Sequence, residues 1–389
     1  MTGVAPADLH PPRGLAAVAL GGFLLQGLIY PVLGPALPTL SAHFGLRATG
    51  ASALLSINSA GAVLGVLLAG WLARRLTFRQ QCLLGAALIA SGCLGLIAAP
   101  SFVLTLLASG LLGLGFGLLD LALNVWVSLS YGGRSAAMLN LLSASFGVGA
   151  VLAPLAVGLS GGNFRVPLFG CAALAALVIV GLLFMPPWQP QPGVVAPVAP
   201  FSSAARSPRL VLGLFILLFL AYVTVEGGVG SWEVSHLRDT LGLGTAAASR
   251  VSAWFWVSFT LGRLLSAGLA LRLPPAHLIG GTLTLAALSL ALATLPAAAP
   301  FAYTLAGLFL APVFTTGLVW LTRVVPGGAA PTLVFAGAFL GPVLFSPLIG
   351  AMRDTFGPVA IPLTLMAVAL LDLALLLGLS RQVRGSFSG

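Results

Sequence analysis

The sequence predicts an all-α polytopic membrane protein that crosses the bilayer twelve times. Hydrophobic residues make up 59% of the 389 residues and charged residues only 6%, whereas about a quarter of a soluble domain is charged. Apolar stretches recur along the whole chain, and each approaches the ~20 residues that a membrane-spanning helix needs. Most connections between them are short, which leaves no room for a soluble domain.

The apolar stretches fall into two groups of six. The expected spans are 15–39, 49–73, 80–99, 102–131, 135–160, 165–185, then 209–235, 246–270, 276–296, 299–324, 328–352 and 356–380. The first stretch is long enough to cross the bilayer, so we interpret it as a membrane helix and not as a cleaved signal peptide. The predicted units are an N-terminal six-helix bundle at 1–185, a cytoplasmic linker rich in Pro, Ala and Ser at 186–208, and a C-terminal bundle at 209–389.

The arginines predict the orientation of these spans. All seventeen basic residues are Arg; eleven fall in connections on one side and five on the other, with one inside a span. Because basic residues accumulate on the cytoplasmic side, both termini are expected there, in the inner (plasma) membrane. The arginines are scattered singly and form no basic face, so a nucleic-acid partner is not expected. The expected partners are the lipid bilayer and a small solute.

The two halves of the chain resemble each other. LLAGWLARRL at 67–76 and LSAGLALRL at 265–273 share a pattern, as do FGVGAVLAPLAVG from Phe146 and FLGPVLFSPLIG from Phe339. Both matches are roughly 195 residues apart and occur in the same order. This offset predicts parallel six-helix repeats related by an axis along the membrane normal. Paired glycines four residues apart are expected to let helices approach closely, and to allow the bundles to rock.

Asp120 and Glu226 lie well inside apolar stretches of a chain that has only seven Asp and Glu. A charged side chain at the bilayer centre costs at least ~2.5 kcal/mol, which makes Asp120 and Glu226 candidates for function. Asp120 and Asn124 are four residues apart and share one helix face. Glycines follow Glu226, and each weakens a helix by ~1 kcal/mol relative to Ala. The alternatives are an Asp120 that only bonds a neighbouring helix and a Glu226 paired with Arg263.

Other polar and aromatic residues complete the candidate site. Arg263 either snorkels to the interface or neutralises a buried acid as a gate. Glu233, near the outer end of span seven, is expected to be a gate or a solvated rim. Gln26 and Asn58 can exchange hydrogen bonds with a polyhydroxylated solute, or with neighbouring helices. Three aromatic residues are candidates for stacking on a sugar, namely Tyr222, Trp232 and Trp256. Anchoring at the membrane interface would explain their presence equally well.

Enzyme chemistry is not expected. The chain has no Lys, which excludes a phosphate-binding loop of the Gly-Lys-Ser/Thr type. His residues are few and dispersed, and the three Cys have neither disulfide nor metal-ligand spacing. No metal site and no cofactor are expected, other than a coupling proton or sodium ion.

Several short motifs carry a family resemblance. GWLARRLTFR at 70–79 resembles a reduced form of the loop between helices two and three in the major facilitator superfamily, without its acidic residue. GAMRDTFG at 350–357 keeps the glycine–acid–glycine pattern between helices eleven and twelve. Together with the six-plus-six organisation, these segments identify the chain as similar to that superfamily. The resemblance implies two parallel bundles and transport by alternating access.

A narrower resemblance concerns the sugar branch of that superfamily. GLGFGLLDLALNVWV at 113–127, LNLLSASFGVGAVLAP at 139–154 and AYVTVEGGVGSWEVSHL at 221–237 are similar to fucose:proton symporters and sodium-dependent glucose transporters. The chain departs from the fucose symporters in helix one, where Gln26 stands in place of an acid. The resemblance implies a monomeric secondary active transporter that moves a monosaccharide by proton or sodium symport. Asp120 and Glu226 would be its coupling or substrate carboxylates.

Two other functions fit the sequence less well. A proton-coupled antiporter that exports drugs or amphipathic metabolites is the main alternative, because APLAVGLSGG at 153–162 is similar to the helix-five segment of such antiporters. Span four lacks the Arg that these antiporters carry. A transport-inactive sensor would need a cytoplasmic signalling extension, which the ends do not offer. The sequence leaves open the sugar, the coupling ion and the direction of transport.

Overall fold

A computed structural model describes residues 11–185, 208–325 and 330–384. Helices make up almost all of this part of the chain, which contains no strand. Short 3-10 turns occur at Gly132–Arg134 and Pro296–Ala298. The α-helices are α1 (Leu15–Ile29), α2 (Leu33–Phe44), α3 (Ala48–Leu72), α4 (Phe78–Ala98), α5 (Phe102–Tyr131), α6 (Ser135–Leu159), α7 (Arg165–Phe184), α8 (Pro208–Leu241), α9 (Thr245–Leu269), α10 (Pro275–Leu292), α11 (Ala299–Val324), α12 (Ala330–Phe356) and α13 (Ala360–Arg384).

The described helices supply up to eleven membrane spans by length and composition, and α9 completes the twelve-helix arrangement. Ten single helices are long and apolar enough to span a bilayer, and α1 with α2 forms one further span bent by 42°. The remaining helix, α9, has 25 residues, but Arg250 and Arg263 lower its hydropathy. It packs against α11 and α6 as the other spans pack against their neighbours. The predicted twelve-helix, multi-pass membrane fold is confirmed.

The first span is broken, which the sequence analysis did not anticipate. α1 ends at Ile29 and α2 begins at Leu33, so the bend lies at residues 30–32. Pro31 explains the break, because proline has no N–H to continue the helical ladder and its ring clashes with the preceding turn. α2 then continues to Phe44, five residues beyond the expected end.

The glycine-rich seventh span is not broken. α8 is one helix of 34 residues, about 51 Å long at 1.5 Å per residue, and it runs through Gly227, Gly228 and Gly230. A Cβ atom at Gly228 or Gly230 would meet the side chain of Leu365 or Trp256. These glycines therefore make room for neighbouring side chains and do not form a hinge in this structure.

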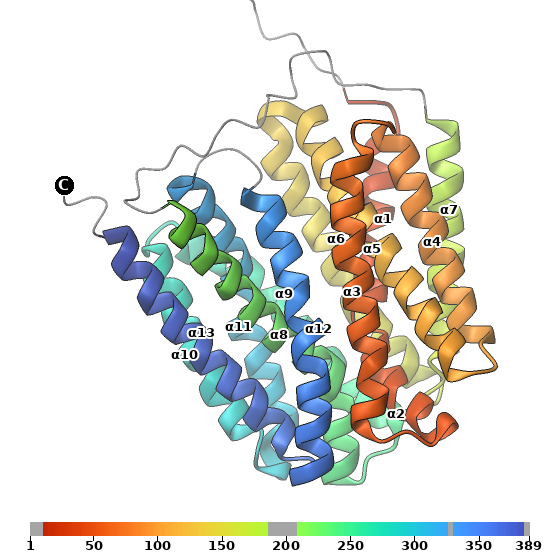
Figure 1. Ribbon diagram of the computed structural model, residues 1–389, viewed down its shortest axis with the longest axis vertical. Coiled ribbons are helices and arrows are strands. Elements are labelled where there is room, and N and C mark those ends of the chain that lie inside the picture. Colours follow the sequence, from red (N-terminus) through yellow and green to blue (C-terminus); the bar gives the residue numbers. More distant parts are fainter. Residues whose placement is uncertain (1–10, 186–207, 326–329, 385–389) are drawn as a thin grey trace, which may run out of the picture.

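The helices form two bundles, α1–α7 and α8–α13, that lie side by side (Figure 1). Between the bundles, α3 packs along α12, α6 along α9 and α2 against α8. We call the end where α7 stops and α8 starts the linker end, which is at the top of Figure 1. The opposite end, where α2 leads into α3, is the far end. The predicted linker at 186–208 lies, apart from Pro208, outside the described residues.

The paired glycines hold helices together within a bundle, not between bundles. A Cβ atom at Gly113 or Gly117 of α5 would meet the backbone of α3. Likewise, a Cβ atom at Gly341 of α12 would meet the α8 backbone. The expectation that these pairs mark surfaces on which the bundles rock is therefore wrong. Other glycines lie between the bundles, notably Gly34 of α2, where a Cβ atom would meet the Gly230 carbonyl of α8.

Candidate substrate site between the two bundles

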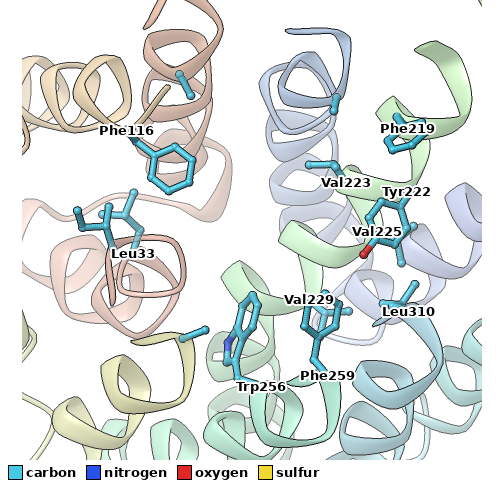
Figure 2. Packing of buried hydrophobic residues seen from close by; sticks show 14 of the residues in the cluster. Leu33, Phe116, Phe219, Tyr222, Val223, Val225, Val229, Trp256, Phe259 and Leu310 are labelled. Atoms are coloured by element: carbon cyan, nitrogen blue, oxygen red, sulfur yellow. The ribbon is translucent and has the colours of Figure 1, made fainter. Parts of the chain in front are cut away.

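Aromatic side chains from both bundles meet around the break in the first span. Tyr30, in the break, has its ring centroid 6.0 Å from Phe116 of α5, 5.9 Å from Phe146 of α6 and 5.7 Å from Trp256 of α9. Figure 2 shows Phe116 and Leu33 on one side of this region, with Trp256 and the residues of α8 on the other. We call Tyr30, Phe116, Phe146 and Trp256 the aromatic cluster. Its rings present apolar faces of the kind that pack on ligands.

A small cavity of about 40 Å³ adjoins this cluster. Its lining combines oxygen-bearing side chains with apolar ones and comes from α2, α3, α8, α9, α12 and the break at Tyr30. Ligand pockets usually measure about 300 Å³ or more, so this cavity is too small for a monosaccharide. The lining residues are Tyr30, Leu33, Leu55, Asn58, Ser59, Gly227, Gly230, Ser231, Trp256, Pro342 and Ser346.

Glu226 and Arg263 bring opposite charges to the same region from the C-terminal bundle. Glu226 is 5% exposed and directly precedes Gly227, which lines the cavity. Arg263 lies two turns beyond Trp256 on α9, and its guanidinium carbon is 4.6 Å from the ring centroid of Phe259. The two charges are near enough to interact through space. Within the described residues, however, no ion pair joins them.

Asp120 lies one turn beyond Phe116 on α5, toward the linker end, and is half-buried. The Asn124 side-chain nitrogen donates to the Asp120 carboxylate over 3.0 Å and to the Asp120 backbone carbonyl over 2.9 Å. The predicted sharing of one face is therefore observed. Asn124 uses its donor to orient the acid, and no basic side chain of the described residues forms an ion pair with Asp120.

The structure separates the remaining polar candidates. Asn58 lines the cavity, and its amide nitrogen donates to the Ser109 carbonyl over 3.0 Å. Gln26 is buried, and its amide nitrogen has no partner in the described part of the chain. Only Asn58 of these two therefore faces the small cavity.

Three candidates of α8 lie away from the cavity. Tyr222 is buried one turn before Glu226; its hydroxyl comes within reach of that carboxylate, but no hydrogen bond of normal geometry joins them. Trp232 lines a separate cavity nearer the far end. Glu233 was expected at a wet outer edge, yet it is 1% exposed and neither carboxylate oxygen has a hydrogen-bond partner among the described residues. Glu233 is not at a wet rim because α8 continues to Leu241, which leaves Glu233 well inside the helix.

Sequence reasoning missed most of the cavity lining. Tyr30, Phe116 and Phe146 were treated only as parts of apolar stretches, and Ser59, Ser231 and Ser346 were not singled out. One signal was available, because Phe116 precedes Asp120 by four residues and so shares its helix face. The three serines lie far apart in the sequence, and only the tertiary fold brings them together.

At the far end, the C-terminal bundle caps a helix of the N-terminal bundle. The Asp354 carboxylate of α12 accepts hydrogen bonds from the backbone nitrogens of Ala48 (3.0 Å) and Thr49 (2.8 Å) and from the Thr49 hydroxyl (2.7 Å). Arg47, the N-cap residue of α3, makes no side-chain capping bond. Asp354 therefore satisfies two of the free N–H groups of α3 and complements its dipole from the opposite bundle.

A second polar contact closes the far end on the other side of the molecule. Arg250 of α9 donates to the Gly158 carbonyl of α6 over 3.0 Å. At Gly350 of α12, the α3 backbone at Ala48 and Thr49 lies so near that a Cβ atom would collide with it. We call these contacts, together with Asp354, the far-end seal. The far-end seal thus joins the bundles by hydrogen bonds from Ala48, Thr49 and Arg250.

Two bundles that meet at a central polar and aromatic region form an architecture typical of membrane transporters. The sequence profile of the Major Facilitator Superfamily matches residues 19–332, and the chain belongs to this superfamily. The predictions of a transporter and of a protein without enzyme activity are thereby confirmed.

Similar proteins include sugar transporters. The chain is 25% identical over 299 residues to sodium-dependent glucose transporter 1A of Mus musculus, covering 66% of the chain and 69% of the relative. It is 32% identical over 174 residues to the arabinose-proton symporter of Escherichia coli K12, covering 44% of the chain and 36% of that protein. The solved D-xylose-proton symporter matches with a TM-score of 0.74 at 16% identity, covering 92% of the chain and 96% of the symporter. Peptide and nucleoside transporters share the fold about as closely, so this likeness shows the fold alone.

Proposed function

We propose that this transporter moves a monosaccharide together with a cation, by alternating access between the two bundles. The proposal is supported by the aromatic cluster between the bundles, with Asp120 one turn from Phe116 on α5 and Glu226 next to the cavity-lining Gly227 on α8. Rings can pack on the apolar face of a sugar, while carboxylates and amides can bond its hydroxyls. Relatives whose names include glucose and arabinose support the substrate class.

The arginine distribution supports a cytoplasmic linker end, with both termini inside the plasma membrane. In this orientation the far-end seal faces the outside, and the structure represents a state closed to the exterior. Import would require the seal to open, a solute to reach the aromatic cluster, and the bundles to rock back. Asp120 and Glu226 are the proposed coupling or substrate groups, Asn124 orients Asp120, and the protein acts as a monomer.

Counterflow in proteoliposomes tests the substrate class without assuming a coupling ion. Purified protein is reconstituted, vesicles are loaded with unlabelled glucose, arabinose, xylose or fucose, and uptake of the same labelled sugar is followed. At least one sugar is expected to accumulate transiently above its equilibrium level, whereas protein-free vesicles show no overshoot. Absence of counterflow with all four sugars, combined with counterflow of a lipophilic cation, would establish the drug-export alternative instead.

A further inference from the structure

We infer that the small cavity beside the aromatic cluster is a binding site for one sodium ion. The inference names the coupling ion of the proposed symport. The coupling of sodium to sugar transport rests on that proposed function, whereas the binding of sodium is inferred from the lining of the cavity alone. The cavity lies between the bundles, so an ion in it would contact both of them.

Serine residues from three helices line the cavity. Ser59 of α3, Ser231 of α8 and Ser346 of α12 line it, and none of them makes a hydrogen bond with the described residues. Elsewhere in the spanning helices, hydroxyls commonly bond to the carbonyl one turn back, as Thr224 does to Leu220 over 2.8 Å. The three serine oxygens are therefore available to a ligand.

Asn58 and Tyr30 add oxygen atoms to this lining. The Asn58 amide nitrogen is occupied by the Ser109 carbonyl, which leaves its side-chain oxygen as the free acceptor. The Tyr30 hydroxyl lies beside Gly227 on α8. Oxygen atoms of hydroxyls, amides and carbonyls are the ligands that hard cations prefer.

Size and charge select the cation. One water molecule needs a cavity volume of about 10–15 Å³, so a cavity of about 40 Å³ holds an ion with one or two waters. Divalent calcium and magnesium are usually held by carboxylates, and none lines this cavity. The nearest acid in sequence, Glu226, lies one residue before Gly227 and already has Arg263 in its electrostatic reach, so neutral oxygen atoms alone line the cavity, as suits a monovalent cation. A bound proton would need one basic group, and none lines this cavity.

Sodium bound here would favour the approach of the two bundles. Ser59 and Asn58 belong to the N-terminal bundle, while Ser231 and Ser346 belong to the C-terminal bundle. An ion that all of them contact binds better when the bundles are close together. By linkage, its binding stabilises that arrangement.

Thermal unfolding of the purified full-length protein tests the site without any sugar. The unfolding temperature is measured during titration with NaCl, KCl or choline chloride at constant total ionic strength. Sodium is expected to raise it in a saturable manner, while potassium and choline are not. Ser231→Ala and Ser346→Ala are each expected to raise the half-saturating sodium concentration about tenfold, a loss of ~1.4 kcal/mol of binding free energy.

Ser235→Ala is the matched control. Ser235 lies one turn beyond Ser231 on α8 but lines the cavity nearer the far end, so its loss should leave the sodium response unchanged. The inference is overturned if sodium has no specific effect on the wild type, or if all three variants respond alike. Counterflow in sodium-free buffer separates the two proposals, because sugar exchange without any sodium effect would support the transport function and reject this site.

Discussion

Asp120 and Glu226 lie in different surroundings, and the difference bears on what each can do. Asp120 is half-buried and bonded by Asn124, whereas Glu226 is 5% exposed and has Arg263 in its electrostatic reach. A carboxylate without a cationic partner at bilayer depth is the group whose charge depends most on a bound cation. Asp120 is therefore the acid whose charge is expected to have the larger effect on transport, whereas Glu226, with Arg263 in reach, is the candidate for a substrate role.

Asp120→Asn is expected to abolish gradient-driven accumulation, because an amide keeps the shape of the side chain but not its charge. Counterflow should stay within about threefold of wild type, which corresponds to less than ~0.7 kcal/mol. Gradient-driven accumulation and counterflow are measured with the same proteoliposomes. Asp372→Asn is the control for removing a buried acid away from the candidate site, since Asp372 lies on α13, which contributes no residue to the small cavity, and this variant should accumulate sugar like the wild type. Full accumulation by Asp120→Asn would remove this acid from coupling.

Two tryptophans that the sequence could not distinguish are expected to behave differently. Trp256 belongs to the aromatic cluster, with its ring 5.7 Å from Tyr30, whereas Trp232 lines the cavity nearer the far end. Trp256→Phe should raise the half-saturating sugar concentration in counterflow about threefold to tenfold, in line with ~0.5–1.5 kcal/mol for an aromatic contact. Trp232→Phe should leave it unchanged. Equal effects of the two variants would contradict the placement of the sugar beside Trp256.

At the scale of elements, α3 depends on the opposite bundle for its cap. Its own N-cap residue, Arg47, is 80% exposed in its side chain and lies 3.9 Å from Asp354. Asp354 supplies the hydrogen bonds, from a position 305 residues further along the chain than Thr49. Whenever the far end opens, α3 loses this cap. The cap therefore favours the closed far end. At the linker end, the loop at 70–79 lacks the acidic residue that the superfamily motif carries, so no acid of that loop can make a corresponding contact.

Asp354→Asn is expected to open the far end more often. A helix cap contributes ~1 kcal/mol, so the open population should rise about fivefold. Labelling of Ser41→Cys, in the cavity nearer the far end, by a membrane-impermeant thiol reagent measures the opening. The native Cys82, Cys93 and Cys171 are all buried and should contribute little background.

Arg47→Gln serves as the comparison for this experiment. Exposed ion pairs contribute little, so the loss of the Arg47 charge should change the labelling rate far less than the loss of Asp354 does. If the two variants label alike, general surface charge and not the helix cap holds the far end closed.

Hydropathy located the helices well, because the bilayer requires long apolar stretches whatever their partners are. Even α9 was predicted, although Arg250 and Arg263 lower its hydropathy. The bend at Pro31 was missed despite a visible proline, since Pro154, Pro312 and Pro342 sit inside unbroken helices. Whether proline breaks a spanning helix depends on neighbours that can satisfy the backbone. The cap from Asp354 and the three serines that line the small cavity depend on contacts between bundles, which no local pattern in the sequence records.

At the scale of the whole molecule, two kinds of close glycine contact distinguish rigid from movable surfaces. Gly113 lets α5 approach α3 inside the N-terminal bundle, where a Cβ atom would meet the Asn58 carbonyl. Gly34 lets α2 approach α8 across the bundles, where a Cβ atom would meet the Gly230 carbonyl. If the bundles move as rigid bodies, the first contact persists through the transport cycle and the second breaks in each cycle.

Alanine at these two glycines is therefore expected to have opposite effects. Gly113→Ala overpacks a permanent contact and should cost ~1–3 kcal/mol of stability, seen as a lower unfolding temperature, without faster labelling of Ser41→Cys. Gly34→Ala strains only the closed state. The bundles can relieve that strain by separating at the far end, so labelling should accelerate while the unfolding temperature falls less. Equal losses of stability with unchanged labelling would show that the α2–α8 contact is as permanent as the contacts within a bundle, and access would then have to arise by bending within the bundles.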